Sequence, residues 1–210
     1  FSHYMNSISG EFDLILMQEA VFSTLAAQSI LQFNGFEQCG VSGFGERLRD
    51  VDYGLLSLSR VPSLKHSFIQ SRAAEPIVNT NKYTLLTFYP IHKSDKMLMV
   101  VNLHVINFVR IEAYKYELNR SLEALNDHLG PIILAGDFNT WSSARTHYLI
   151  HTIKQIGLTQ VSIASKHRRS RWGTVVDYVF VKDLVIKKVN PMKMQSFSDH
   201  IPLNIVVALQ

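Results

Sequence analysis

Residues 133–140, ILAGDFNT, place an aspartate and an asparagine two positions apart, directly after an aliphatic run and a glycine. The run of Ile132, Ile133 and Leu134 predicts a short strand that is buried on both faces. A carboxylate at the end of such a strand is not core filling, and an ionised Asp137 there needs a partner. The candidates are a metal ion, a hydrogen-bonding neighbour and a substrate, and the rest of the sequence has to distinguish them.

The chain has 210 residues, of which 47% are hydrophobic and 18% are charged. This length suits one substantial core and is short for two, so we expect a single globular domain over residues 1–210. No apolar run reaches the roughly 18 residues that span a bilayer, which predicts a soluble domain without a transmembrane segment. The sequence opens at Phe1 rather than at a methionine, so a signal peptide or anchor upstream is not excluded.

The single cysteine, Cys39, excludes an internal disulfide and a thiolate zinc site. A reducing compartment fits this, and we expect a cytoplasmic location. The formal net charge of +4 favours an anionic partner, and residues 166–171 (KHRRSR) concentrate positive charge. A solvated basic loop explains that cluster equally well.

Strand-like apolar runs occur at residues 13–17, 54–58, 83–89, 97–103, 132–135, 175–181 and 201–207. Helical periodicity is clearest over residues 21–32 and 110–129, and the second of these patterns stops at Gly130-Pro131. Strands outnumber helices, and helices are missing between several consecutive strands. We therefore expect a mixed α/β layered domain rather than a strictly alternating Rossmann or TIM arrangement.

Polar residues gather at these predicted strands. Most follow a strand end, whereas Asp177 interrupts a strand from within; the others are Gln18-Glu19, Asn102 with His104, Asp137 with Asn139, and Asp199-His200. Taken alone, Glu19 suits the first turn of a helix, Asp137 a cap, and His104 a satisfied core position. Jointly they indicate a site, because side chains at strand ends converge when the strands share a sheet. Its oxygen-rich ligands favour Mg²⁺ or Mn²⁺ over zinc.

In this order and at these separations, the motifs QE, NLH, GDFN, DYVFV and SDH resemble the endonuclease/exonuclease/phosphatase superfamily, the metal-dependent fold of DNase I, apurinic endonucleases and neutral sphingomyelinases. The longer stretches GEFDLILMQEAV, VVNLHVINF and GPIILAGDFNTWS are similar to a bacterial group typified by the YafD protein. The resemblance implies a four-layer α/β sandwich. In this fold two mixed β-sheets pack face to face with helices on the outside, and the site lies at one end of the sheets.

The resemblance also implies roles for individual residues. Glu19 would be the principal metal ligand, with Asp199 beside the metal, bound directly or through water. Asp137 and Asn139 would contact the scissile phosphate and its nucleophile. The implied cofactor is Mg²⁺, with Mn²⁺ as an alternative.

The same carry-over gives His200 the role of general base or of phosphate-stabilising group. Asp177 would accept a hydrogen bond from its ring and so fix the tautomer and orientation. His104, on the opposite flank, would stabilise the pentacovalent phosphate or help to protonate the leaving oxygen. Asn102 is a candidate substrate contact.

This chemistry suits a phosphodiester or phosphomonoester, because a divalent cation neutralises the phosphate while a base activates water for in-line attack. We expect DNA or RNA as the favoured substrate and no obligate protein partner. A phospholipid or inositol-phosphate hydrolase is the alternative enzyme, and a non-catalytic binding module that retains the fold is the alternative class. The sequence has no GxSxG and no GxxxxGK[ST] motif, which disfavours a Ser/His/Asp hydrolase and a P-loop enzyme.

In the family, a first strand that ends in an asparagine adds a polar residue to the metal site, and this sequence begins after that strand. We expect the chain to lack it, with Asn6 in a helix or turn. Arg171 and Trp172 are candidate contacts for a substrate phosphate and for a stacked base or headgroup, although a ring packed back on the sheet is the alternative. His147 and His151 have metal-ligand spacing on a helix but no third ligand nearby.

Overall fold

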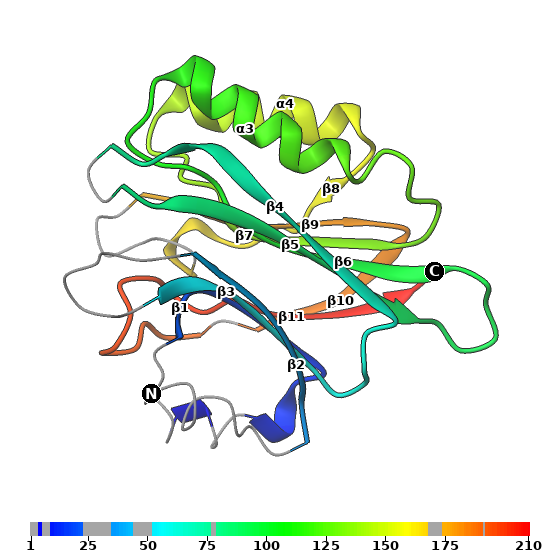
Figure 1. The fold of residues 1–210 in the computed structure, drawn as a ribbon. Coiled ribbons are helices and arrows are strands. Elements are labelled where there is room, and N and C mark those ends of the chain that lie inside the picture. The colour runs from blue at the N-terminus through cyan, green and yellow to red at the C-terminus, as the bar shows by residue number, and fades with distance from the viewer. Residues whose placement is uncertain are drawn as a thin grey trace.

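The computed structural model describes residues 4–5, 9–22, 35–43, 52–76, 79–167, 174–190 and 192–210. In these residues a central sheet lies between a pair of helices on one side and smaller sheets on the other (Figure 1). This arrangement confirms the expected α/β sandwich. No helix in the described ranges is long and apolar enough to cross a membrane.

The central sheet has six strands in the order β4-β5-β6-β7-β9-β8. They are β4 Lys65–Ala74, β5 Asn81–Pro90, β6 Met97–His104, β7 Ile132–Asp137, β8 Thr159–Gln160 and β9 Asp177–Lys182. β6 and β7 are parallel, and every other described pair in this sheet is antiparallel. A parallel pair needs a crossover, which runs through helix α3 (Ile111–Glu123). The ends of β6 and β7 and the start of β9 therefore lie next to one another, at the same end of the central sheet.

Helices α3 and α4 (Ser143–Gln155) cover one face of the central sheet (Figure 1). Apolar residues of α3, among them Tyr114, Leu118 and Leu122, are buried in the main hydrophobic cluster. In that cluster they join sheet residues such as Leu134 and Phe180. This packing fixes α3 against the sheet next to the loops that follow β6 and β7.

The second layer consists of two antiparallel sheets in the described residues. One has the order β1-β3-β2, with β1 Leu14–Phe22, β2 Glu37–Gly43 and β3 Asp52–Ser59. The other pairs β10 (Leu184–Asn190) with β11 (Asn204–Leu209). Both pack on the central sheet: Leu55 meets Leu85, and Ile205 joins the cluster of Val179 and Val181. Two short 3₁₀ helices, η1 (Ser9–Glu11) and η2 (Ser165–His167), complete the described elements.

Several predicted boundaries were wrong. The strand expected at 13–17 continues to Phe22, so no helix begins at Val21, and residues 23–34 lie outside the described ranges. Helix α3 ends at Glu123 instead of residue 129, and the turns that follow carry Asn126 and Asp127. The last strand begins at residue 204 rather than 201, which agrees with the lack of a ladder-forming N–H at Pro202.

Candidate functional site

Three polar residues lie side by side where three neighbouring strands of the central sheet end or begin. The parallel register pairs His104 of β6 with Asp137 of β7, and the antiparallel register pairs Asp137 with Asp177 of β9. Each of the three is only 7% exposed. Asp177 begins β9 instead of interrupting a strand, and the reversed direction of β9 brings it to the edge where β6 and β7 end. We call these three residues the buried row.

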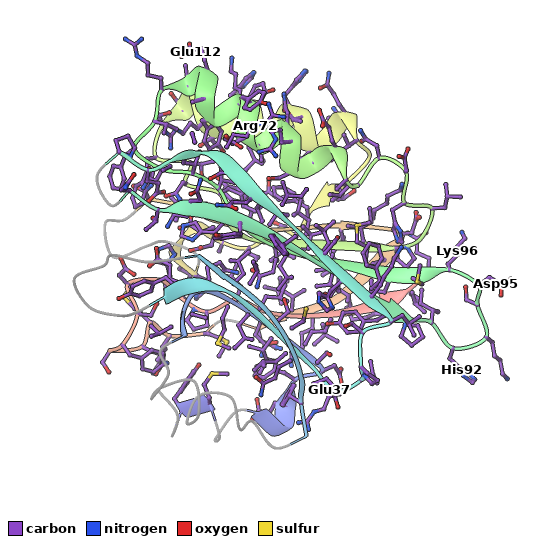
Figure 2. The ribbon with its side chains drawn as sticks, in the orientation of Figure 1. Glu37, Arg72, His92, Asp95, Lys96 and Glu112 are labelled. Carbon is purple, nitrogen blue, oxygen red and sulfur yellow. The ribbon has the colours of Figure 1, made fainter. Side chains whose placement is uncertain are left out.

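The buried row lies at the end of β6 that is remote from the polar turn joining β5 and β6. His92, Asp95 and Lys96 of that turn project into solvent away from the body of the molecule (Figure 2). The charges of the turn therefore play no part in the site.

Gly136 allows β6 and β7 to approach closely beside the buried row. Its φ is 152°, and a Cβ atom at this position would collide with the Leu103 carbonyl oxygen. Asn139 has a φ of 48°, in the left-handed region that asparagine tolerates better than most residues. The glycine and the asparagine of GDFN are thus suited to the backbone that carries Asp137.

Asn139 is held from several directions. Its backbone N–H donates to Asp137 Oδ1 at 2.8 Å, and its Nδ2 donates to the Val105 carbonyl at 2.7 Å. Trp141 Nε1 donates to Asn139 Oδ1 at 2.7 Å, and an Arg145 Nη1 group donates to the Asn139 carbonyl at 2.9 Å. The side chain and the backbone of Asn139 are therefore both fixed.

His200, in the loop before β11, contacts Asp177 as predicted. Its Nδ1 lies 2.7 Å from Asp177 Oδ2, and its Nε2 lies 3.9 Å from Asp199 Oδ1. Burial by itself lowers the pKa of His200, but the hydrogen bond to Asp177 and the charges of Asp177, Asp137 and Asp199 outweigh it and raise the pKa to about 9. The imidazolium is the main form of His200 at neutral pH.

The pKa of Asp137 is also raised, which for a carboxyl group favours the neutral form. Burial and the charge of Asp177 raise its pKa, as does Glu19 more weakly, whereas the Asn139 backbone N–H and the charge of His200 lower it. The net result is a pKa of about 7. Asp137 therefore exchanges a proton near neutral pH, unlike an ordinary aspartate.

His104 is neutral. Burial, followed by the charges of Lys82 and His200, lowers its pKa well below the ordinary value. Its Nε2 lies 3.6 Å from Asp137 Oδ2, a distance at which charged groups would form an ion pair. Because the buried ring is uncharged, we regard this approach as a dipolar contact.

Glu19 lies in a β-bulge rather than in the first turn of a helix. The register of β1 against β3 shifts between Met17 and Ala20, and Glu19 has a φ of 54°. Its side chain is 64% exposed, and its Oε1 lies 3.4 Å from Lys82 Nζ. Lys82 also lies 3.5 Å from the buried Glu75 carboxylate. Lys82 was not predicted as a site residue, because a single lysine at the start of an apolar strand belongs to no recognisable sequence motif.

A pocket opens between this bulge and the buried row. Glu19, Lys82 and His104 line it together with Tyr53 and Thr80. The pocket reaches the His104 side of the row.

Asn102 bridges the two layers of the sandwich. It is fully buried, and its Oδ1 accepts from Gln18 Nε2 at 2.6 Å. Its Nδ2 donates to the carbonyls of Met17 and Leu56 at 3.1 and 3.2 Å. These contacts belong to a structural link that anchors the Glu19 bulge, and they leave Asn102 without exposure to a substrate.

Asp137, Asp177 and His200 each offer a potential ligand atom, and these atoms lie within 4.8 Å of one another. Two buried carboxylates that repel each other fit a hard divalent cation, which would relieve the repulsion. The predicted ligands Glu19 and Asp199 are outside this group but flank it, and their role remains a prediction.

Other candidates are separate from the site or lie outside the described ranges. His147 and His151 are exposed on α4, and neither belongs to a group of three potential ligands in the part of the chain that the structure describes. Arg171 and Trp172, the predicted substrate contacts, and Asn6 lie outside the described residues.

Related sequences indicate the family of the chain. A sequence model of the Endonuclease/Exonuclease/phosphatase family matches residues 3–200. A UPF0294 protein of Vibrio vulnificus is 34% identical over 203 residues, covering 95% of this chain and 68% of that protein. A UPF0294 protein of Yersinia pseudotuberculosis is 37% identical over 133 residues, covering 63% of this chain and 50% of that protein. The chain thus spans about half the length of the Yersinia relative. These relatives belong to the bacterial group that the sequence resembles.

Solved structures share the fold at low sequence identity. An endonuclease/exonuclease/phosphatase of Bacteroides vulgatus superposes with a TM-score of 0.71 at 17% identity, covering 100% of this chain and 90% of that one. The human Nocturnin catalytic domain with bound sulfate superposes with a TM-score of 0.69 at 16% sequence identity, covering 99% of this chain and 85% of that one. A mannosyl-6-phosphatase of Bacteroides thetaiotaomicron superposes with a TM-score of 0.67 at 13% sequence identity, covering 99% of this chain and 90% of that one. With its family model matched over nearly its whole length, the chain belongs to the endonuclease/exonuclease/phosphatase family.

Proposed function

We propose that this chain hydrolyses phosphate esters with a divalent cation, Mg²⁺ or Mn²⁺, by in-line attack of an activated water. The observation that carries the proposal is the buried row of His104, Asp137 and Asp177 with His200 hydrogen-bonded to Asp177. Such a row combines a proton acceptor, an imidazolium and a neutral imidazole at one edge of the sheet. These are the groups that attack on an anionic ester requires.

The protonation states of Asp137, His200 and His104 indicate a different role for each side chain. In the cation-free protein Asp137, with a pKa of about 7, is suited to accept a proton from a nearby water, whereas a bound cation would favour its ionised form, which serves as a ligand. His200 is already an imidazolium at neutral pH, so in the cation-free protein it is better suited to stabilise the phosphate charge than to act as a base. Asp177 holds the ring and its charge. Neutral His104 is suited to donate a hydrogen bond at the opposite flank.

The cation would be held by carboxylates of the site. Asp137 and Asp177 are buried neighbours, and Glu19 and Asp199 supply further carboxylates at its border. When bound, a divalent cation would neutralise charge on the phosphate and on the attacking oxygen. Glu19 would then share its carboxylate between Lys82 and the cation, or exchange one for the other.

Nucleic acid is the substrate we favour. The net charge of +4 suits a polyanion, and a phosphodiester backbone offers many phosphates to the same surface. The fold alone does not choose, since structures that share it include a domain with bound sulfate and a mannosyl-6-phosphatase. Substrate preference therefore has to be measured.

The test is hydrolysis of DNA, RNA, sphingomyelin and phosphoinositides side by side, with Mg²⁺ and with EDTA. We expect cation-dependent cleavage of nucleic acid, lost in His200→Ala and retained in Asp95→Asn, a variant of the remote turn. Binding of nucleic acid should weaken as salt rises. Lipid hydrolysis without nuclease activity would reverse the substrate preference, and an absence of cation binding and of hydrolysis would leave a non-catalytic module.

A further inference from the structure

Trp141 makes a contact with the site that neither the motif series nor the proposed roles use. Its indole Nε1 donates to Asn139 Oδ1 at 2.7 Å, across only two residues of sequence. The ring is 37% exposed, whereas Asn139 is 2% exposed. A surface indole thus reaches inward to a buried amide beside Asp137.

Two partners determine which way the Asn139 amide points. The indole N–H of Trp141 can only donate, so it requires the amide oxygen. The Val105 carbonyl can only accept, so it requires the amide nitrogen. The orientation follows from the chemistry of both partners and not from the shape of the amide. Among the described residues, Val105 is the one acceptor for Nδ2, which leaves its second N–H available.

Arg145 restricts a different degree of freedom. Its guanidinium donates to the Asn139 carbonyl at 2.9 Å and to the Val109 carbonyl at 2.7 Å. The backbone of Asn139 is therefore anchored independently of Trp141. The indole acts instead on the side-chain amide, together with the Val105 carbonyl.

We propose that Trp141 is a positioning residue, whose indole N–H keeps the Asn139 amide turned so that an N–H faces the substrate phosphate. Phosphate oxygens only accept hydrogen bonds, so an amide turned the other way would present a repelling oxygen. The inference rests on the proposed function, in which Asn139 contacts the scissile phosphate. It adds a residue that acts through another and touches no substrate itself.

The test compares Trp141→Phe with Tyr148→Phe. Tyr148 donates its hydroxyl to Asn119 Oδ1 at 2.9 Å between α4 and α3, so both variants remove an aromatic donor from an asparagine oxygen. With bis(p-nitrophenyl) phosphate and Mg²⁺, Trp141→Phe should lower kcat ~10–100-fold, somewhat less than the loss of a whole transition-state donor. KM should change less than ~3-fold, because the contact matters most as charge develops. Tyr148→Phe should behave as the wild type.

Two further measurements separate positioning from general damage. Replacing Trp141 by its benzothiophene isostere, which removes the N–H and keeps the ring size, should reproduce the Trp141→Phe loss. In an Asn139→Ala background, Trp141→Phe should have no further effect, since the two residues act as a unit. Titration with inorganic phosphate should show binding changed less than ~3-fold by either change at Trp141, in line with the small change in KM.

The outcomes distinguish the two proposals. An active wild type with an unaffected Trp141→Phe, or additive losses in the double variant, overturns the role of Trp141 and leaves the proposed function intact. A wild type that neither hydrolyses the ester nor binds phosphate overturns the proposed function and this inference together.

Discussion

Ionising Asp137 in the folded protein costs free energy, because the side chain is buried beside Asp177, and this makes Asp137 a source of pH-dependent stability. Its pKa is 3.8 in the absence of perturbation and about 7 in the native protein, so the native state keeps a proton that the unfolded chain has lost. The stabilising contribution is fully present below pH ~4 and is lost as the pH rises through 7.

We predict that, in EDTA, the Tm of the wild type falls relative to that of Asp137→Asn as the pH rises from 5 to 8. At pH 8 the variant should be more stable by on the order of a few kcal/mol, because it no longer carries the buried charge. Thermal unfolding across this range measures the difference. Asp95→Asn, in the exposed turn, is the matched control, and a gap that does not depend on pH would refute the electrostatic explanation.

A second prediction at this scale concerns the pair of Asp177 and His200. Asp177→Asn should preserve the fold and lower kcat by an amount approaching the loss in His200→Ala, ~10²–10³-fold, because both changes weaken the stabilisation of the phosphate charge. The pKa of His200 should also fall, because the hydrogen bond and the carboxylate charge that raise it are lost. Kinetics of both single variants and the double variant, with an NMR titration of His200, test this. Additive kinetic losses would show that Asp177 serves the strand and not the chemistry.

At the scale of elements, the close contact between β6 and β7 positions His104 and Asp137 of the buried row. Gly136 sits where a side chain would meet the Leu103 carbonyl, one residue before Asp137. We predict that Gly136→Ala destabilises the protein by about 3 kcal/mol or more, because backbone has to move. Denaturant unfolding measures the change. Gly10→Ala, with open space around the added methyl, should be close to neutral.

Elements with an apolar run or a clear period were predictable, and those without one were not. β5, β6 and β7 are buried over most of their length and were expected from the sequence. β4 has mostly exposed residues and β10 carries Lys187 and Lys188, so neither offers a continuous apolar signal. β2 contains Gly40 and Ser42, which weaken strand propensity. These strands form through pairing with neighbours, a tertiary effect that local sequence does not encode.

The whole molecule brings together residues that are far apart in the chain. Strand-end motifs predicted His104 and Asp137, whereas Asp177 was expected inside a strand. The order of the sheet makes positions 104, 137 and 177 neighbours. Lys82, Trp141 and Arg145 had no such signal. Their contacts depend on the packing of one layer against another, or on a local turn, and a single sequence specifies neither.

The assembled site leads to a prediction about the whole domain. A divalent cation that binds the native protein and not the unfolded chain should raise its Tm, by about 2.7 kcal/mol of stabilisation at a concentration 100 times Kd, or roughly 5–10 °C for a chain of this size. The rise should be larger at pH 8 than at pH 5, because a protonated Asp137 is a poor ligand and its pKa is about 7. Thermal unfolding with MgCl₂ or MnCl₂, against KCl of equal ionic strength, measures it. Asp137→Asn and Glu19→Gln should each reduce the shift, whereas Asp95→Asn should not. An equal response to KCl would mean that the cations only screen the surface, and that the carboxylates of the buried row bind no metal.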